Sequence, residues 1–283
     1  MNGDGAIRRM EEGDLPGADA LRHLAGWNQT LADWRRLLRY APEGCFVAEK
    51  AGRIAGVATT TRHGTDLAWI GMVLVHPDFR RQGIGRALLR FSLAHLDAVG
   101  CRCVKLDATP AGKPLYESLG FREEWPLARW EGAAPEDLVA EGGVRPWAAR
   151  DREAAARLDD AAFGVSRAPW FDRLLEASVA VVAEARGQLA GFGMRRSGAR
   201  AAYLGPVIAE SAEAGRAMVA ALLAGAKGQT VYWDIPEAAG EASALAARLG
   251  FRRQRPLLRM FRGENARPGI PSRQFAIADP ATG

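Results

Sequence analysis

Cysteine and histidine are scarce in this sequence, which has three cysteines and four histidines among 283 residues. An odd number of cysteines cannot all pair, and Cys101 and Cys103 lie too close in sequence for a comfortable bridge. We therefore expect reduced thiols that act as small buried hydrophobic residues. The histidines are scattered and show no ligand spacing with each other or with the cysteines. The sequence thus predicts no metal site.

Long hydrophobic runs are also missing. No apolar stretch approaches the length of about 18 residues that a membrane-spanning helix needs, and residues 1–14 lack the pattern of a signal peptide. We expect a cytoplasmic protein with no membrane partner. The net charge of +5 is small enough to reflect a solvated surface. No nucleic-acid partner is expected, because basic and aromatic residues are not interleaved. DNA binding with a steep salt dependence would revive that alternative.

The composition is that of an ordinary folded protein. Hydrophobic residues make up 48% of the sequence and charged residues 25%, which is enough apolar surface for packed cores. The length exceeds that of a usual single domain, so two domains are expected.

The sequence repeats itself. "FVAEKAGRIAGV" (46–57) matches "VVAEARGQLAGF" (181–192), and "AWIGMVLV" (68–75) matches "AYLGPVIA" (202–209). Further matches join 85–89 to 215–219, "LGFR" at 119–122 to "LGFR" at 249–252, and Arg129 to Arg259. The second copy lacks four residues at the turn "RRQGIG" (80–85), because the offset falls from 134 at residue 68 to 130 at residue 85. Two copies of one domain are therefore expected.

The first copy alternates strand and helix patterns, which predicts an α/β (α+β) fold. Expected strands include 6–10, 46–62 with a turn at Ala51 and Gly52, and 66–75 stopped by Pro77, while 15–40 has helical spacing. "QFAIA" (274–278) is a candidate added edge strand. The expected domains are 1–130 and 144–262, with a linker at 131–143 and a tail at 263–283.

The turn between the third of these strands and the next helix has the features of a phosphate-binding nest. Gly83 and Gly85 let the backbone curl so that successive N–H groups point inward, and the following helix adds its unpaired N-terminal donors. Arg80, Arg81 and Arg86 add positive charge, which suits a pyrophosphate. The alternative is a basic helix start whose glycines serve packing alone.

These residues resemble the GNAT superfamily of acyl-CoA N-acyltransferases. Its signature is an Arg/Gln-x-x-Gly-x-Gly/Ala loop after a strand ending in apolar-x-Val-x-Pro, here "VLVHPDFRRQGIG" (73–85), with "YESLGF" (116–121) downstream. The resemblance covers about residues 6–130, and about 144–262 without the loop. It implies tandem GNAT domains with a degenerate second copy, each a mixed, mostly antiparallel twisted sheet flanked by helices.

The resemblance implies acetyl-CoA as the co-substrate and no metal. The backbone at Val73, Leu74 and Val75 would pair with the pantetheine arm. The loop backbone would bind the pyrophosphate through Arg81, Gln82, Gly83, Ile84, Gly85 and Arg86, with Arg80 beside them. Many members have an asparagine six residues before the tyrosine of the second motif. Pro110 stands there in this sequence, so that contact is absent or replaced, with Lys113 as one replacement.

The chemistry implied by the resemblance needs an oxyanion donor and an acid for the departing thiolate. A backbone N–H near Val73, at a bulged strand end, is the implied donor, and Tyr116 is the implied acid. The alternative role of Tyr116 is a core aromatic. His63, Asp66 and Asp107 are candidate bases by position, although capping or surface roles suit each of them and a water chain serves equally well.

The second copy is not expected to hold a cofactor, because it lacks the loop and has Ala246 at the tyrosine position. We expect it to enclose the substrate side of the site and to set substrate specificity. Asp234 corresponds to Asp107, and both are candidates to meet a cationic amine or to cap a loop. The expected activity is acetyl transfer to a primary amine of a small molecule or peptide by direct attack. The alternative is an acyl-CoA sensor without turnover.

Overall fold

The computed structural model describes residues 6–139 and 142–283, so residues 140 and 141 of the expected linker and residues 1–5 of the first expected domain lie outside it. The elements of the first copy are β1 (Ile7–Arg9), η1 (Glu12–Asp14), α1 (Leu15–Leu24), α2 (Leu31–Tyr40), β2 (Cys45–Lys50), β3 (Arg53–His63), β4 (Leu67–Val75), η2 (Pro77–Phe79), α3 (Ile84–Ala98), β5 (Cys103–Ala108), α4 (Lys113–Glu117) and β6 (Arg122–Ala133).

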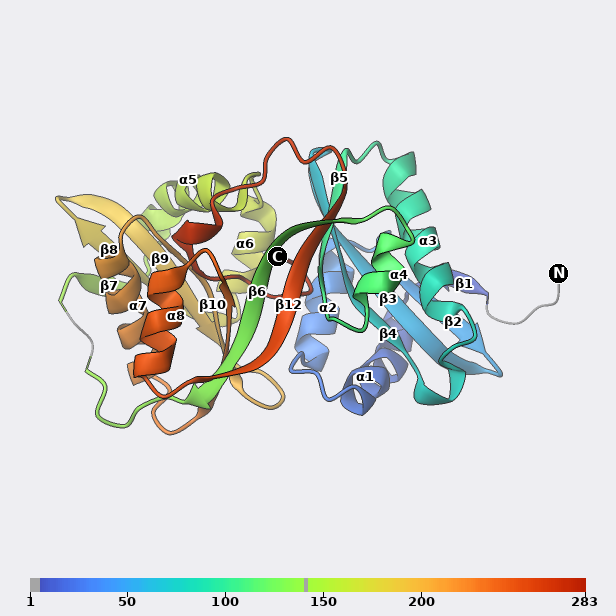
Figure 1. The fold of residues 1–283 in the computed structure, drawn as a ribbon, viewed down its shortest axis with the longest axis horizontal. Helices are drawn as coiled ribbons and strands as arrows, with labels where there is room; N and C mark the ends of the chain where they lie inside the picture. The colour runs from blue at the N-terminus through green and yellow to red at the C-terminus, as the bar shows by residue number, and fades with distance from the viewer. Residues whose placement is uncertain (1–5, 140–141) are drawn as a thin grey trace.

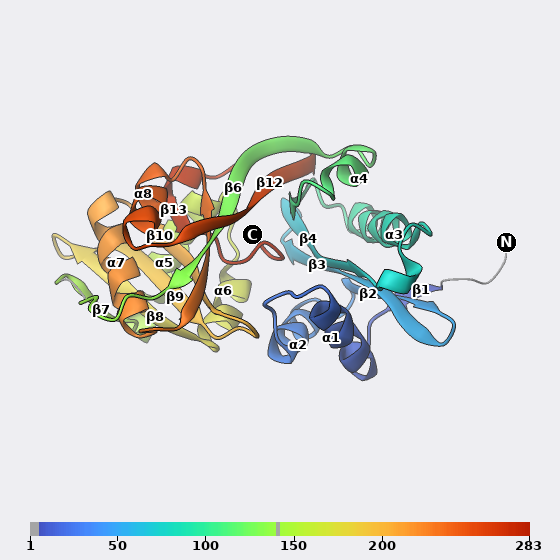
Figure 2. The ribbon, with the colours of Figure 1, turned by 60° about the horizontal axis from the view of Figure 1, so that its bottom comes forward.

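Within the described residues, the second copy has the same order of elements except that it lacks a counterpart of η2. They are β7 (Val144–Pro146), η3 (Ala149–Asp151), α5 (Arg152–Phe163), α6 (Ala168–Leu175), β8 (Ser178–Ala185), β9 (Gln188–Arg196), β10 (Ala202–Ala209), α7 (Ala212–Ala224), β11 (Thr230–Pro236), α8 (Gly240–Arg248) and β12 (Arg252–Gly263), followed by η4 (Pro271–Arg273) and β13 (Gln274–Ala276). The expected α/β fold of two tandem copies is confirmed, with a mostly antiparallel sheet that carries helices on both faces (Figures 1 and 2).

The two copies share one sheet because they exchange their last strands. Within the described residues the strand order is β1-β2-β3-β4-β5-β12-β6-β11-β10-β9-β8-β7, with β13 beside β10. β12 of the second copy lies between β5 and β6 of the first, and β6 pairs with β11 of the second. Figure 1 shows β6 and β12 running together between the two halves. The domain limits expected at residues 130 and 262 fall inside these exchanged strands.

Each exchanged strand forms a buried ion pair with the other copy. Arg259 on β12 donates to both carboxylate oxygens of Asp107 on β5, at 2.9 Å each. Arg129 on β6 donates to both oxygens of Asp234 on β11, at 2.9 and 2.6 Å. Asp107 and Asp234 were expected to cap a loop or meet an amine, but each is instead a buried partner of an arginine from the other copy. Removing one partner of such a pair typically costs about 3–5 kcal/mol.

The expected helical segment 15–40 is two helices rather than one. Gly26 adopts φ +66 just after α1, a backbone conformation that a helix cannot continue through. A new start follows, because the Thr30 hydroxyl accepts a hydrogen bond from the Asp33 N–H and the Asp33 carboxylate accepts one from the Thr30 N–H. Figure 2 shows α1 and α2 on the face of the sheet opposite α3 and α4.

The tail strand β13 lies inside the molecule, so its expected place at a sheet edge is wrong. It pairs with β10, with Ala276 opposite Val207, in the region where β10 has separated from β11. Its Phe275 is buried, and the Phe275 carbonyl accepts a hydrogen bond of 2.7 Å from Trp233 Nε1. The tail then crosses to the first copy, where the Pro280 carbonyl accepts a hydrogen bond of 3.1 Å from Trp69 Nε1. Among the described residues, no helix has the length and apolar character that a membrane span requires.

Candidate active site

An opening in the sheet of the first copy begins at a bulge in β4. Thr59 of β3 pairs with Gly71, but Val57 pairs with Leu74, so β4 has one more residue than β3 in this interval. Met72 takes φ +51 at the bulge. β4 pairs with its parallel neighbour β5 only at residues 68 and 69, and the two strands diverge beyond that point. The strand end 73–75 therefore has a free edge where a ligand can pair with the backbone.

The loop that follows β4 has the backbone geometry of an anion nest. Arg81 has φ +61 and Gly83 has φ +84, and α3 begins directly afterwards at Ile84. Residues of alternating handedness turn successive N–H groups toward one side, and the start of α3 adds its own unpaired donors. A Cβ added at Gly83 would meet no described atom within 4 Å, so the φ angle, rather than crowding, requires glycine there.

Hydrogen bonds from polar side chains hold the loop in shape. Arg80 Nε donates to the Val75 carbonyl at 3.3 Å, and Gln82 Nε2 donates to the Asp78 carbonyl at 3.1 Å. Lys50 at the end of β2 donates to Gln82 Oε1 at 3.0 Å, which adds a cation that the motif alone did not predict. The loop thus presents backbone donors while its polar side chains hold its shape.

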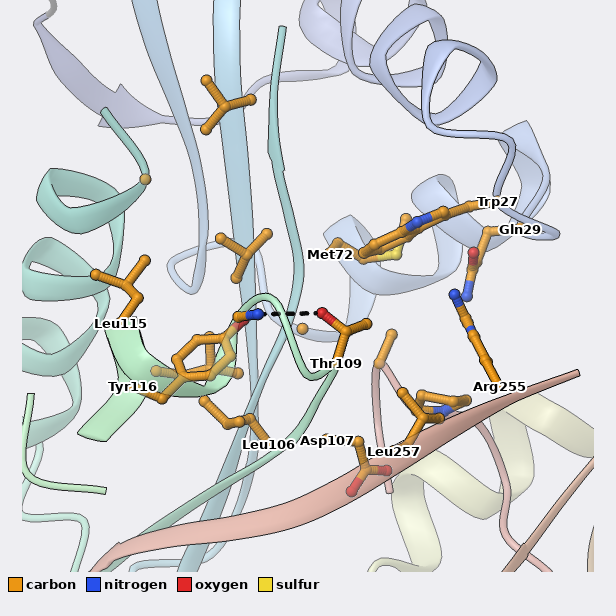
Figure 3. Close-up of a pocket in the computed structure, with 18 of the residues that line it drawn as sticks. Trp27, Gln29, Met72, Leu106, Asp107, Thr109, Leu115, Tyr116, Arg255 and Leu257 are labelled. Carbon is orange, nitrogen blue, oxygen red and sulfur yellow. Dashed lines mark hydrogen bonds between the residues drawn. The ribbon is translucent and has the colours of Figure 1, made fainter. Parts of the chain in front are cut away.

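The opening continues into a cavity of about 280 Å³. Its walls on the first copy include Val73, Val75, Gly85 and Tyr116. The opposite wall is formed by three segments that the sequence motifs did not connect. They are Trp27 and Gln29 between α1 and α2, Arg255 and Leu257 of β12, and Pro280 and Ala281 of the tail. Figure 3 shows Tyr116 and Arg255 on opposite sides of this cavity.

Tyr116 faces the cavity from the short helix α4. Burial raises the pKa of its phenol to about 12, so it carries its proton throughout the physiological range. The turn before α4 is held by a hydrogen bond of 3.2 Å from the Gly112 N–H to Thr109 Oγ1, drawn as a dashed line in Figure 3. Lys113 is engaged with Glu123 at 2.5 Å and Glu117 at 3.3 Å, which leaves it poorly suited to replace the asparagine contact that Pro110 lacks.

The three candidate bases lie in different places. His63 is buried against Phe163, outside the cavity, and burial followed by the charge of Arg167 lowers its pKa to about 3. Asp66 is on the surface, 3.3 Å from Arg102. Only Asp107 lines the cavity, and Arg259 occupies both of its oxygens. A capping or surface role, expected for all three, is wrong for His63 and Asp107, because both are buried among long-range partners.

The corresponding opening in the second copy is filled by the chain itself. β10 and β11 pair at residues 202–204 and then separate, as β4 and β5 do, but β13 occupies the gap. Gly215, the counterpart of Gly85, lies against the Phe275 ring closely enough to leave no room for a Cβ. Ala246, at the position of Tyr116, is buried in the core. Within the described residues, this copy thus lacks the open gap and the tyrosine of the first copy.

Comparison with known proteins identifies the class that this fold and this cavity define. Two family models, each described as "Acetyltransferase (GNAT) domain", match residues 41–123 and 155–276. The chain therefore belongs to the GNAT acetyltransferases, in a tandem arrangement.

Curated relatives match part of the chain. It is 28% identical over 174 residues to "Uncharacterized N-acetyltransferase YitH" of Bacillus subtilis, covering 60% of this chain and 61% of that protein. It is 39% identical over 104 residues to mycothiol acetyltransferase of Thermobispora bispora, covering 32% of this chain and 35% of that one. The matches thus span less than two thirds of either relative.

Solved structures share the whole architecture. A putative acetyltransferase from Pyrococcus horikoshii has a TM-score of 0.86 at 20% identity, covering 100% of this chain and 97% of that one. A tandem GNAT protein from the clavulanic acid biosynthesis pathway has a TM-score of 0.69 at 16% identity, covering 92% and 98%. At such identities the likeness shows the fold.

Proposed function

We propose that the first copy is an N-acetyltransferase that uses acetyl-CoA and a primary amine, either a small molecule or a peptide terminus. The observation that carries this proposal is the meeting of three features at one cavity: the nest at 80–86, the bulged end of β4, and the protonated Tyr116. Acetyl-CoA would supply an acetyl group on a thioester, which the amine attacks directly.

Each feature has a task in this proposal. The backbone N–H groups of residues 81–86 bind the diphosphate, with Arg80, Arg81 and Arg86 adding charge. The open edge at Val73, Leu74 and Val75 pairs with the pantetheine arm, and an N–H at the bulge donates to the carbonyl oxygen where negative charge develops. Tyr116 holds a proton for the departing sulfur. Burial that raises the pKa of the phenol also raises that of a thiolate leaving into the same cavity, so the transfer stays feasible.

No side chain in the described lining of the cavity is assigned as the base. Asp107 lines the cavity but is held by Arg259 through both oxygens, so we assign it to structure rather than to proton transfer. Loss of the amine proton to water meets the requirement, since the attacking amine needs only to be neutral.

Two measurements on the full chain test the proposal. Calorimetric titration with acetyl-CoA should show binding, and release of free thiol from acetyl-CoA should depend on an added primary amine. Absence of acetyl-CoA binding would contradict the assignment of the nest. Tight binding with no amine-dependent thiol release across a broad amine panel would favour the acyl-CoA sensor instead.

A further inference from the structure

The centre of the molecule holds one more cation than anions. Strands of both copies and the tail bring together a set of charged side chains, which are Arg129, Arg196, Arg255, Arg259, Asp107, Asp234 and Asp279. Three of the arginines each take one aspartate: Arg129 with Asp234, Arg259 with Asp107, and Arg196 with Asp279 at 3.0 Å. The fourth arginine is Arg255.

Arg255 has no carboxylate partner within the described parts of the chain. Its Nε is buried and makes no hydrogen bond to any described residue. Burial, followed by the charge of Arg129, lowers the pKa of its guanidinium. A guanidinium that is largely removed from water and lacks a carboxylate of its own is unfavourable unless something else supplies negative charge. Asp234 and Asp279 act on Arg255 only from a distance, because each of them is paired with another arginine.

The position of Arg255 points to the source of that charge. Its side chain extends from β12 into the cavity toward Gln29, across from Tyr116 (Figure 3). The Gln29 amide is fixed by donating to Asp279 Oδ1 at 3.2 Å, and Trp27 and Leu257 make the neighbouring wall apolar. The arginine is therefore the only cationic side chain in the described lining that is not already paired with a carboxylate.

Comparison of the two copies indicates that this arginine is not required by the fold. "WPLAR" (125–129) in β6 corresponds to "RPLLR" (255–259) in β12, so Trp125 occupies the matching position. Trp125 has a packing role, because the guanidinium of Arg259 lies 4.0 Å from its ring centre. The same site on the scaffold thus accepts an apolar aromatic in one copy and a cation in the other.

We propose that Arg255 binds an anionic group of the acyl acceptor, so that the acceptors are small amines bearing a carboxylate or a phosphate. The inference rests on the proposed function of this cavity. The planar guanidinium presents paired N–H donors that match either oxyanion. A cavity of about 280 Å³ accommodates a compact metabolite or the end residue of a peptide.

Matched acceptor pairs test the inference in turnover. β-Alanine is compared with β-alaninamide, and phosphoethanolamine with ethanolamine, by amine-dependent thiol release from acetyl-CoA. At least one acidic member should have the higher kcat/KM, and the pair that shows the preference identifies carboxylate or phosphate. Arg255→Met should reduce kcat/KM for that acid by about tenfold or more and leave its neutral partner nearly unchanged. Acetyl-CoA affinity should be unaltered.

Arg253→Met is the matched control, because Arg253 lies on the same strand but pairs with Glu237 at the surface. It should retain the preference for the acid. Equal turnover of both members of both pairs in the wild type, or equal losses in the two variants, would overturn the inference.

A binding measurement separates this inference from the proposed function. Inorganic phosphate and acetate are titrated into the protein saturated with CoA, which occupies the nest, and into the protein alone. Binding of either anion that Arg255→Met removes and Arg253→Met retains supports the site even if no amine is acetylated. If neither anion binds the wild type and no acidic amine is preferred, the inference fails, while acetyl-CoA binding still decides the proposed function.

Discussion

The two copies differ at the gap between their two parallel strands, but they share the ion pairs beside their first strands. Arg8 and Asp14 in the first copy, and Arg145 and Asp151 in the second, pair at the same distance of 2.7 Å. Each arginine also reaches a glutamate on the next strand, Glu49 or Glu184. In both copies these pairs connect the first strand to the turn that follows it. We therefore assign what both copies keep to the fold.

The gap between the two parallel strands shows the opposite case. In both copies two parallel strands separate, which creates a gap in the sheet. In the second copy, Phe275 and its strand fill the gap permanently, whereas in the first copy the gap adjoins the nest and the cavity. What only the first copy keeps, namely the loop 80–86 and Tyr116, is therefore what we assign to function.

The largest expected effect is on the nest. Gly83→Val should reduce acetyl-CoA affinity by about 100-fold or more, because a β-branched residue strongly disfavours φ +84. The exposed loop should relax into another shape and lose the nest rather than unfold the domain, so the circular dichroism spectrum and the melting point should stay near wild type. Gly187→Val is the control, since Gly187 has φ +76 in an open turn of the second copy. Normal acetyl-CoA affinity in Gly83→Val would return the loop to a plain helix start.

The next effect concerns the tyrosine that the second copy lacks. Tyr116→Phe should lower kcat by about 10²-fold, the contribution of a general acid, with little change in the Kd for acetyl-CoA. Since burial raises the pKa of Tyr116 to about 12, the rate should not fall between about pH 6 and about pH 10 through loss of this proton. An unimpaired variant would leave Tyr116 as a core aromatic.

The two-copy fold and the loop at 80–86 could be predicted from the sequence, because local motifs determine local geometry. The repeat indicated two copies, and the glycines of "RRQGIG" predicted a nest where Gly83 indeed has positive φ. The strand exchange could not be predicted. β6 and β12 carry the same Pro-Leu-x-Arg pattern, so the sequence does not indicate which of them pairs with β5 and which with β11. The burial of Asp107 depends on Arg259, 152 residues away, and no local pattern encodes that distance.

The position of the tail strand was predicted wrongly for a related reason. "QFAIA" has the pattern of a short apolar strand, and an edge is the usual place for an added strand. Its interior position follows from the gap beside β10, which only the assembled sheet creates. Arg255 likewise gave no signal in a single strand, because its lack of a partner becomes evident only when three other arginines have taken the aspartates.

Removing the filler of the second gap tests stability rather than activity. Phe275→Ala should lower the free energy of unfolding by about 3–5 kcal/mol, as expected for truncating a buried phenylalanine. It should not create a second acetyl-CoA site, because the second copy still lacks the nest. Denaturant unfolding and calorimetry check the two statements separately. A loss below about 1 kcal/mol would mean that Phe275 is not a substantial part of that core.

The smallest effect is expected from one loop charge. Arg81→Ala should weaken acetyl-CoA binding several-fold at low ionic strength and less at high ionic strength, because salt screens its attraction for phosphate. Arg216→Ala in the second copy removes a surface charge paired with Glu241 and should change neither value. A salt-independent loss in Arg81→Ala would point to the loop backbone rather than to charge.

The number of acetyl-CoA molecules bound per chain tests the central claim most directly. Calorimetric titration of the wild-type protein should give one site per chain, and Gly83→Val should remove it. Two equivalent sites would contradict the account, because they would require the opening filled by Phe275 to bind the ligand as well as the first copy does.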